Sequence, residues 1–217
     1  MSNSEDHRWL AAAARLAQRG IPLSRPNPSV GALIVRNDKV IARGWTKPGG
    51  RPHAEAVALS AAGEDAIGAT LYVTLEPCAH RSARGPACAD LVTSSGIARV
   101  VVGCADPDPR TAGQGIARIE AAGIETELLD STACRRSLAG YLMQRHGRRP
   151  HVTLKLALSD DARLAPPPGE GQWLTGAMAR AHVHAWRARM DAILVGSGTL
   201  RADDPRLDVR LPGIEDR

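Results

Sequence analysis

The chain has 217 residues, of which 43% are hydrophobic and 24% charged, a composition typical of soluble globular proteins with one domain or two. No apolar run approaches the roughly 20 residues of a membrane span, and the polar stretch 1–6 lacks the apolar centre of a signal peptide, so we expect a cytoplasmic protein without a membrane partner. The net charge of +5 fits a nucleic acid, an anionic small molecule or a solvated arginine-rich surface, but no basic stripe with interleaved aromatic residues is present and we expect no nucleic-acid partner.

The first part of the chain alternates between helix and strand patterns. Apolar residues at helical spacing from Leu10 to Ala17 predict a helix over 7–18. Asn37-Asp38 predicts the turn of a hairpin. Further along, we expect strands at 31–36, 40–45, 70–75, 99–104 and 124–128, and helices at 53–62, 88–95, 116–122 and 130–144. This alternation favours an α/β layered domain whose later strands are parallel.

A second unit follows a basic stretch. We place the first domain at 1–145, a linker at 146–150 and the second unit at 151–217. The predicted elements of the second unit are a strand at 151–158, a polar loop at 159–172, a helix at 175–189, a strand at 192–195, a helical turn at 199–204 and an extended segment at 207–210. The length of this second unit, 151–217, is close to the lower limit for independent folding. We therefore expect an incomplete domain, and an exposed apolar face on it would favour a homo-oligomer.

The residues that indicate chemistry are His53-Ala54-Glu55, Pro77-Cys78 and Cys88. In a cytosolic chain, cysteines with such neighbours indicate metal binding or catalysis rather than disulfides. Catalytic zinc takes three protein ligands and keeps one position for water, whose pKa it lowers to roughly 7. We expect His53, Cys78 and Cys88 to hold zinc, and Glu55, at the same helix start, to transfer protons without binding the metal.

The spacing leaves several interpretations open. Zinc nucleobase deaminases carry H-x-E followed by P-C-x-x-C, whereas here Cys88 lies ten residues after Cys78. That gap and the appended unit argue against a deaminase of nucleic acids. A structural zinc site would need a fourth ligand, for which His80 is the candidate. Each part alone fits inert core residues, but the combination, with a Glu76-Pro77 turn after a strand, favours a zinc deaminase.

Further motifs extend this pattern over the whole first domain. They are Pro26-Asn27-Pro28-Ser29-Val30-Gly31, Thr74-Leu75-Glu76-Pro77-Cys78-Ala79-His80, Pro86-Ala87-Cys88, Asp106-Pro107-Asp108-Pro109 and Gly113-Gln114-Gly115. Together they resemble the bifunctional deaminase–reductase family of riboflavin biosynthesis. That family typically has a gap of nine between its cysteines, so this chain carries one additional residue in the loop 81–85.

The resemblance implies a fold and a reaction. The fold is a three-layer α/β/α cytidine-deaminase-like domain with a mixed sheet, followed by a partial dihydrofolate-reductase-like α/β unit. The substrate is 2,5-diamino-6-ribosylamino-4(3H)-pyrimidinone 5′-phosphate, deaminated with zinc to 5-amino-6-(5-phosphoribosylamino)uracil and ammonia. Asn27 and His80 are the implied substrate contacts. From the residues alone, Asn27 is equally a loop residue bonded to its own backbone, and His80 a surface or supporting histidine.

For the second unit, the resemblance implies an NADPH-dependent reductase. Ala157, Trp173, Thr199 and Asp203 would contact NADPH, and Arg187, Leu207 and Arg210 would hold the phosphoribosyl substrate, since a guanidinium fork suits phosphate. From the residues alone, the arginines are solvated surface and Trp173 is core. The family's S-L-D-G is Ser159-Asp160-Asp161-Ala162 here, an expected serine is Gly171, and the family's C-terminal half with its glycine-rich loop is not in the sequence. We therefore expect the reductase to be inactive in this chain.

Overall fold

The structure is a computed structural model that describes residues 3–164 and 173–214. Contacts divide the chain into two compact units, Met1–His151 and Val152–Arg217, and each is described by itself. The domain end predicted at 145 falls inside a helix of the first unit, which continues to Gly147. In the described part of the chain, no helix is both long enough and apolar enough to cross a membrane.

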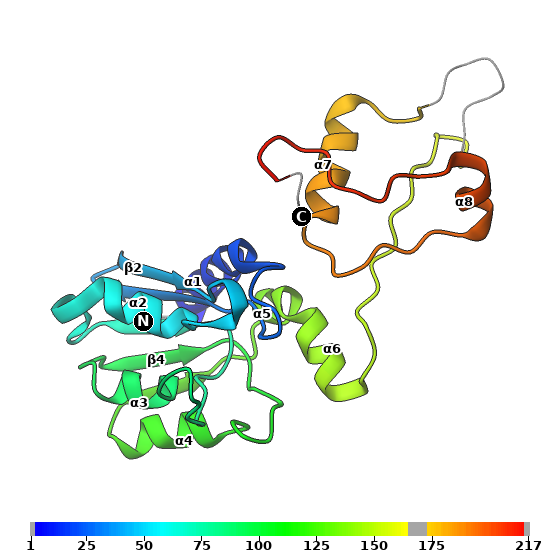
Figure 1. Ribbon diagram of the computed structural model, residues 1–217. Helices are drawn as coiled ribbons and strands as arrows, with labels where there is room; N and C mark the ends of the chain where they lie inside the picture. Colours follow the sequence, from blue (N-terminus) through cyan, green and yellow to red (C-terminus); the bar gives the residue numbers. More distant parts are fainter. Residues whose placement is uncertain (1–2, 165–172, 215–217) are drawn as a thin grey trace. The chain divides into compact units, whose positions relative to one another are not determined.

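A five-stranded mixed sheet forms the centre of the first unit (Figure 1), with strand order β2-β1-β3-β4-β5. Strand β1 pairs antiparallel with β2 and with β3, whereas β3, β4 and β5 run parallel, as predicted. The strands are β1 (Gly31–Arg36), β2 (Lys39–Trp45), β3 (Thr70–Val73), β4 (Arg99–Val102) and β5 (Glu125–Leu128). Strands β3 and β4 end two residues earlier than predicted, because the chain turns there towards the site described below.

The predicted hairpin between β1 and β2 is confirmed. Asn37 and Asp38 form its two-residue turn and have φ angles of 50° and 58°. This left-handed region is one that asparagine and aspartate tolerate better than most residues, and it matches the twist of the strands. The turn fixes the register of the edge strand, with Arg36 opposite Lys39.

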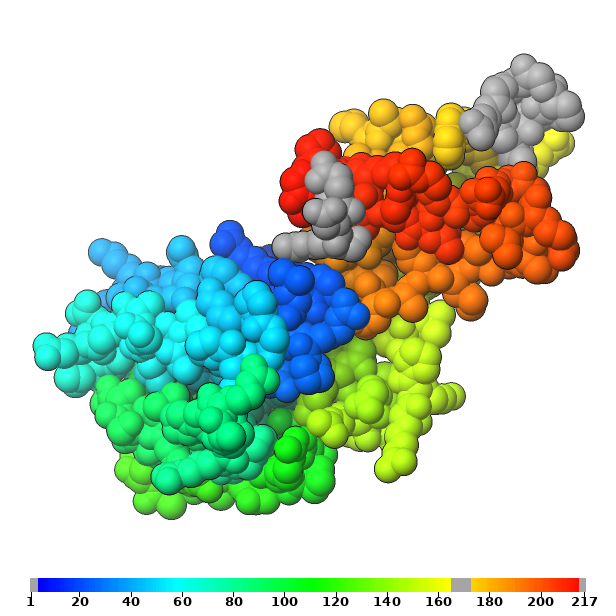
Figure 2. Space-filling view, viewed as in Figure 1, coloured from blue at the N-terminus to red at the C-terminus, as the bar shows by residue number. Residues whose placement is uncertain are grey.

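Helices cover both faces of the sheet, which gives the predicted three layers (Figure 1). Helices α1 and α5 pack together on one face, and α2, α3 and α4 lie side by side on the other. In Figure 2, the cyan residues of α2 and the green residues of α3 and α4 hide this second face of the sheet. The helices of the first unit are α1 (Asn3–Ala17), α2 (Ala54–Ala62), α3 (Cys88–Thr93), α4 (Gln114–Ala121), α5 (Thr132–Ser137) and α6 (Ala139–Gly147). Three short 3-10 helices are η1 (Gln18–Gly20), η2 (Pro48–Gly50) and η3 (Gly63–Ala66).

One predicted helix, 130–144, is in fact two helices. They meet at Leu138, whose φ of −102° and ψ of 7° are not helical and whose side chain is buried in the core. Gly140 follows two residues later, and glycine weakens a helix interior by about 1 kcal/mol. The apolar periodicity of the sequence did not reveal this break.

Close backbone contacts set the distance between the helices and the sheet. The core contains no phenylalanine and is built mainly from alanine, valine, leucine and isoleucine. A Cβ atom on Gly31 would lie 2.0 Å from the carbonyl oxygen of Ala13, and one on Gly44 would lie 2.0 Å from that of Ala54. These glycines therefore let α1 and α2 touch the sheet directly, and the second contact fixes the start of α2.

The second unit contains helices α7 (Ala177–Arg187) and α8 (Ser197–Asp203) in its described residues. The strands predicted at 151–158 and 192–195 are wrong, since no strand forms among the described residues of this unit. A strand needs a hydrogen-bonded neighbour, and apolar side chains of both segments are exposed instead, Leu154 to 77% and Leu194 to 97%. The predicted loop 159–172 is described only as far as 164, and Gly171 lies outside the described residues.

Candidate active site

Three sulfur and nitrogen ligands converge at one end of the sheet. His53 immediately precedes α2, Cys78 follows β3 and Cys88 is the first residue of α3. Their ligand atoms all lie within 4.8 Å of one another. The Nδ1 atom of His53 is 3.6 Å from the Cys78 sulfur and 3.3 Å from the Cys88 sulfur. The structure thus brings together the three residues predicted to bind zinc.

The start of α3 is fastened to Cys78. The backbone N–H of Cys88 donates to the Cys78 sulfur at 3.3 Å, and that of Ala89 donates to the Cys78 carbonyl at 3.1 Å. Amides in the first turn of a helix have no acceptor within the helix. Cys78 supplies these acceptors, so folding of α3 itself brings the two cysteines together.

The electrostatics of this cluster favour metal ligation. The hydrogen bond shared with Cys88, together with that to His53, lowers the pKa of Cys78 to about 3, and the same sharing raises the pKa of Cys88. Burial lowers the pKa of His53, but the hydrogen bond to Cys78 and the charge of Glu55 outweigh it, and the net shift is upward. The pair of thiols therefore gives up a first proton easily and needs a cation to give up the second.

The donor set fits zinc. One imidazole nitrogen and two thiolates are borderline and soft ligands of the kind that Zn²⁺ selects, and three protein ligands are the number found at catalytic sites. Among the described residues, His80 does not belong to the cluster. Its Nδ1 atom faces the Thr111 hydroxyl at 3.5 Å. The arrangement thus supports three ligands rather than the four of a structural site.

Glu55 lies next to the cluster, in the first turn of α2. Its side chain is 3% exposed, and burial raises its pKa to about 7 although the nearby charge of His53 opposes the shift. It is not a member of the ligand group among the described residues. A carboxyl group with a pKa near neutrality can both accept and donate a proton at physiological pH.

Asn27 lies on the opposite side of the imidazole from the sulfurs. Its Nδ2 atom is 3.2 Å from the Nε2 atom of His53 and donates to the carbonyl oxygen of Gly50 at 2.9 Å. The side chain is therefore held by a segment 23 residues away. A Cβ atom on Gly50 would lie 2.8 Å from the Asn27 side chain, and the φ of Gly50 is +83°. Both observations require glycine here.

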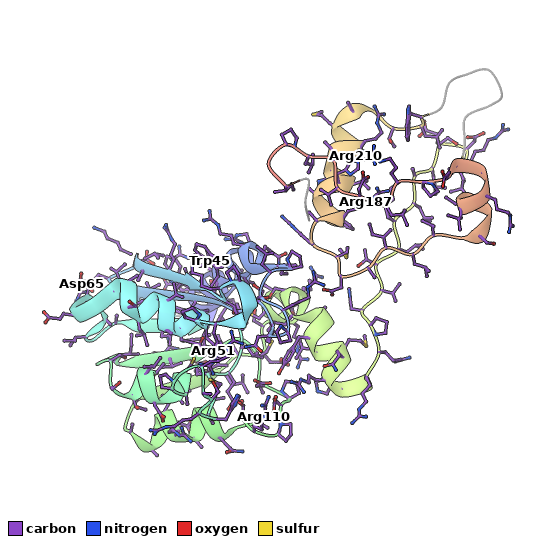
Figure 3. All side chains as sticks on the ribbon, in the orientation of Figure 1. Trp45, Arg51, Asp65, Arg110, Arg187 and Arg210 are labelled. Atoms are coloured by element: carbon purple, nitrogen blue, oxygen red, sulfur yellow. The ribbon has the colours of Figure 1, made fainter. Side chains whose placement is uncertain are left out.

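Two arginine hydrogen bonds join the loop between Cys78 and Cys88 to the neighbouring segment 49–51. Arg84 donates to the Gly49 carbonyl at 2.6 Å, and Arg51 donates to the Pro86 carbonyl at 3.3 Å. Figure 3 labels Arg51 in this region. Neither these contacts nor the hydrogen bonds of Glu76 can be read from the sequence, because both involve backbone atoms distant along the chain.

In the second unit, two of the predicted substrate arginines come together (Figure 3). Arg187 and Arg210 both donate to the carbonyl oxygen of Arg206, at 3.3 and 3.4 Å. Leu207 beside them is 40% exposed. These three roles stay predictions.

The four residues predicted to contact NADPH lie in different local structures. Thr199 and Asp203 are exposed residues of α8. Trp173 is 62% exposed and stacks under the Arg180 guanidinium at 5.0 Å, so it is not a core residue. Ala157 lies outside the helices of this unit and is half-buried. Their roles likewise stay predictions.

Two known families match separate parts of the chain. Residues 3–104 match the family described as the cytidine and deoxycytidylate deaminase zinc-binding region. Residues 150–217 match the RibD C-terminal domain. The second match begins two residues before the second unit does, and the first match lies entirely within the first unit.

Individual relatives resemble both units together. Riboflavin biosynthesis protein RibD of Escherichia coli (strain K12) is 43% identical over 215 residues, which cover 98% of this chain and 58% of the relative. The structure of Acinetobacter baumannii RibD, form 1, is 42% identical with a TM-score of 0.83, over 98% of this chain and 60% of that one. A diaminohydroxyphosphoribosylaminopyrimidine deaminase/5-amino-6-(5-phosphoribosylamino)uracil reductase from Thermotoga maritima is 37% identical with a TM-score of 0.84, over 95% and 61%. The chain spans 58% of the length of the E. coli relative, and it belongs to the RibD family of riboflavin biosynthesis proteins.

Proposed function

We propose that the first unit is a zinc-dependent hydrolytic deaminase of riboflavin biosynthesis. Its substrate is 2,5-diamino-6-ribosylamino-4(3H)-pyrimidinone 5′-phosphate. The observation that carries the proposal is the convergence of His53, Cys78 and Cys88 beside the buried carboxyl group of Glu55. The membership of the RibD family supports the choice of substrate.

The reaction replaces an amino group by oxygen. Water adds to the ring carbon, the carbon–nitrogen bond breaks, and ammonia leaves. Held by His53, Cys78 and Cys88, a zinc ion would supply Lewis-acid chemistry and lower the pKa of water into the neutral range. Glu55 takes up a proton from water and delivers it to the departing nitrogen. Its pKa of about 7 suits both steps.

Asn27 and His80 are proposed as the substrate contacts of the deaminase. Asn27 is fixed beside the ring of His53, with 3.2 Å between its Nδ2 atom and Nε2. His80 lies two residues after Cys78, and its Nδ1 atom is 3.5 Å from the Thr111 hydroxyl. Both side chains are half-buried and therefore keep some access to a ligand.

For the second unit, we infer the binding roles of the reductase domain. Arg187 and Arg210, with Leu207 beside them, would hold the phosphoribosyl group, and their shared carbonyl contact supports this pairing. Ala157, Trp173, Thr199 and Asp203 would contact NADPH. Oxidation of NADPH in the presence of the deaminated product tests whether this chain completes the reduction.

The surface of the second unit bears on how the protein assembles. Large apolar side chains of the second unit are exposed, among them Val152, Met178 and Leu194 at 78%, 89% and 97%. Burial of such residues is a strong force for association, and we infer a homo-oligomer in the cytoplasm. Sedimentation of the purified chain distinguishes this from a monomer.

The test of the deaminase is ammonia release from the pyrimidine phosphate by zinc-loaded protein. Glu55→Gln should keep the metal and lower the rate at least about 100-fold, since a positioned acid–base group contributes that much or more. Glu64→Gln removes an exposed carboxylate just beyond α2 and should change nothing. Wild-type turnover by Glu55→Gln, or deamination of tRNA or single-stranded DNA instead of the pyrimidine, would contradict the proposal.

A further inference from the structure

Glu76 is a buried carboxylate whose partners are all backbone amides. The residue is 3% exposed. Oε1 accepts hydrogen bonds from the N–H groups of Gly115 and Ile116 at 2.9 and 3.2 Å. Oε2 accepts from Gly113 and Asp106 at 3.0 and 3.2 Å. In the part of the chain that the structure describes, it has no cationic partner, so these four bonds alone compensate its burial.

The four donors belong to one continuous segment. It consists of the loop 106–113 and the first turn of α4. The amides of a first helical turn lack acceptors within the helix, and the helix start carries partial positive charge. A carboxylate placed there fixes both the position and the direction of the helix. Glu76 therefore joins the end of β3 to a segment 30 to 40 residues further along the chain.

The same segment packs directly on the peptide that leads to Cys78. A Cβ atom on Gly115 would lie 1.9 Å from the carbonyl oxygen of Pro77, so only glycine allows α4 to approach so closely. The backbone N–H of Glu76 also donates to the Cys104 carbonyl, at 2.9 Å. The turn before Cys78 is thus held by the segment that follows β4 and by α4 together.

The loop 106–113 also reaches a residue beside the metal ligands. Thr111 within this loop lies 3.5 Å from the Nδ1 atom of His80. His80 follows Cys78 by two residues. The segment that Glu76 holds therefore contacts both the turn before Cys78 and the residue two positions after it.

We propose that Glu76 is a positioning residue of the metal centre, acting through its four backbone hydrogen bonds on the turn that carries Cys78. The inference rests on the proposed function, because it takes His53, Cys78 and Cys88 as the zinc ligands. Glutamine has the same shape but offers one carbonyl oxygen and presents an NH₂ group to amides that are themselves donors. Removal of a group that orients a metal ligand typically lowers metal affinity or activity about 10- to 100-fold.

The experiment compares Glu76→Gln with Glu120→Gln, which removes an exposed carboxylate from the same helix. Zinc affinity is measured by competition with a chelator, and cobalt(II) is titrated in parallel because its absorption reports thiolate ligation. We expect an affinity about 10- to 100-fold weaker for Glu76→Gln and unchanged for Glu120→Gln. A folded Glu76→Gln protein with affinity within about twofold of wild type overturns the proposal.

If Glu76→Gln does not fold, a second pair of variants tests the proposal. Gly115→Ala separates α4 from the Pro77 carbonyl, whereas Gly140→Ala in α6 adds a methyl group into open space. Weaker zinc binding by Gly115→Ala alone supports the proposal, and equal affinities overturn it. Wild-type protein that binds one zinc but releases no ammonia contradicts the proposed function and leaves the role of Glu76 untouched.

Discussion

Asp6 in the first helix accepts two parallel hydrogen bonds from Arg99 in β4, at 2.9 and 3.0 Å, although the two residues are 93 positions apart. The hydroxyl group of Tyr72 donates to the same carboxylate at 2.7 Å. Asp6 is 1% exposed. The N-terminal helix is therefore attached to the middle of the sheet through a buried charge.

Asp6→Asn should destabilise the protein by about 3 kcal/mol at pH 7, because the variant leaves the Arg99 guanidinium without its buried partner. Burial raises the pKa of Asp6, but Arg99 and Tyr72 lower it by more. The stabilisation is thus present above the unfolded pKa, near 3.8, and is lost as the pH falls through the lower folded value. Urea unfolding at pH 7 and in acid measures this. Asp38→Asn, which affects an exposed ion pair with Arg8, should cost less than about 1 kcal/mol.

Glu55 should have the opposite pH dependence in metal-free protein. Its pKa rises from 4.5 to about 7 on folding, so the folded state binds a proton more tightly than the unfolded state. Wild-type stability should therefore fall as the pH rises from about 4.5 to 7. Glu55→Gln removes this loss. The free energy of unfolding of the variant, relative to that of wild type, should therefore increase by up to roughly 3 kcal/mol from pH 5 to pH 8. A stability difference between the two proteins that is the same at both pH values contradicts this.

Metal removal should loosen the first unit. A ligand at about 1,000 times its Kd stabilises the folded state by about 4 kcal/mol, and each kcal/mol corresponds to about 2–4 °C in Tm for a chain of this length. We expect a chelator to lower the Tm of zinc-loaded wild type by roughly 10 °C. The Tm of Cys78→Ser should respond much less, and a full response by that variant would show that the metal binds elsewhere.

Gly44→Ala should disturb the site from a distance. The new methyl group would lie 2.0 Å from the carbonyl oxygen of Ala54, the first residue of α2 and the neighbour of His53. We expect a loss of about 1–3 kcal/mol in stability and weaker zinc binding. Gly140→Ala, which meets nothing within 4 Å, is the matched control and should bind zinc like wild type. Normal zinc affinity of Gly44→Ala would show that α2 can move without displacing His53.

Local patterns were sufficient to predict much of the first unit. The hairpin turn at Asn37 and Asp38 needs only two residues of the right type, and the parallel strands appear as short apolar runs between turns. The ligand cluster could also be predicted, because His53, Cys78 and Cys88 are chemically distinctive and each begins or follows an element. Their convergence within 4.8 Å then follows from the strand order.

Long-range backbone contacts explain what the sequence did not reveal. Nothing near Glu76 in the sequence indicates that its carboxylate accepts hydrogen bonds from backbone amides beyond residue 105. The helix break at Leu138 depends on how this side chain packs in the core, which apolar periodicity does not report. Residues 151–158 have the composition of a strand, yet a strand also requires a neighbour to pair with, which composition cannot supply.

The glycine contacts of the first unit have a consequence for how its sequence can vary. At Gly31 and Gly44, main-chain atoms of helix and sheet meet directly, so no side chain sets the spacing between these layers. Exchanges among aliphatic residues elsewhere in the core can therefore be absorbed by side-chain repacking. The position of His53 is determined by contacts between main-chain atoms. Substitutions of core side chains should therefore leave the geometry of the metal centre unchanged.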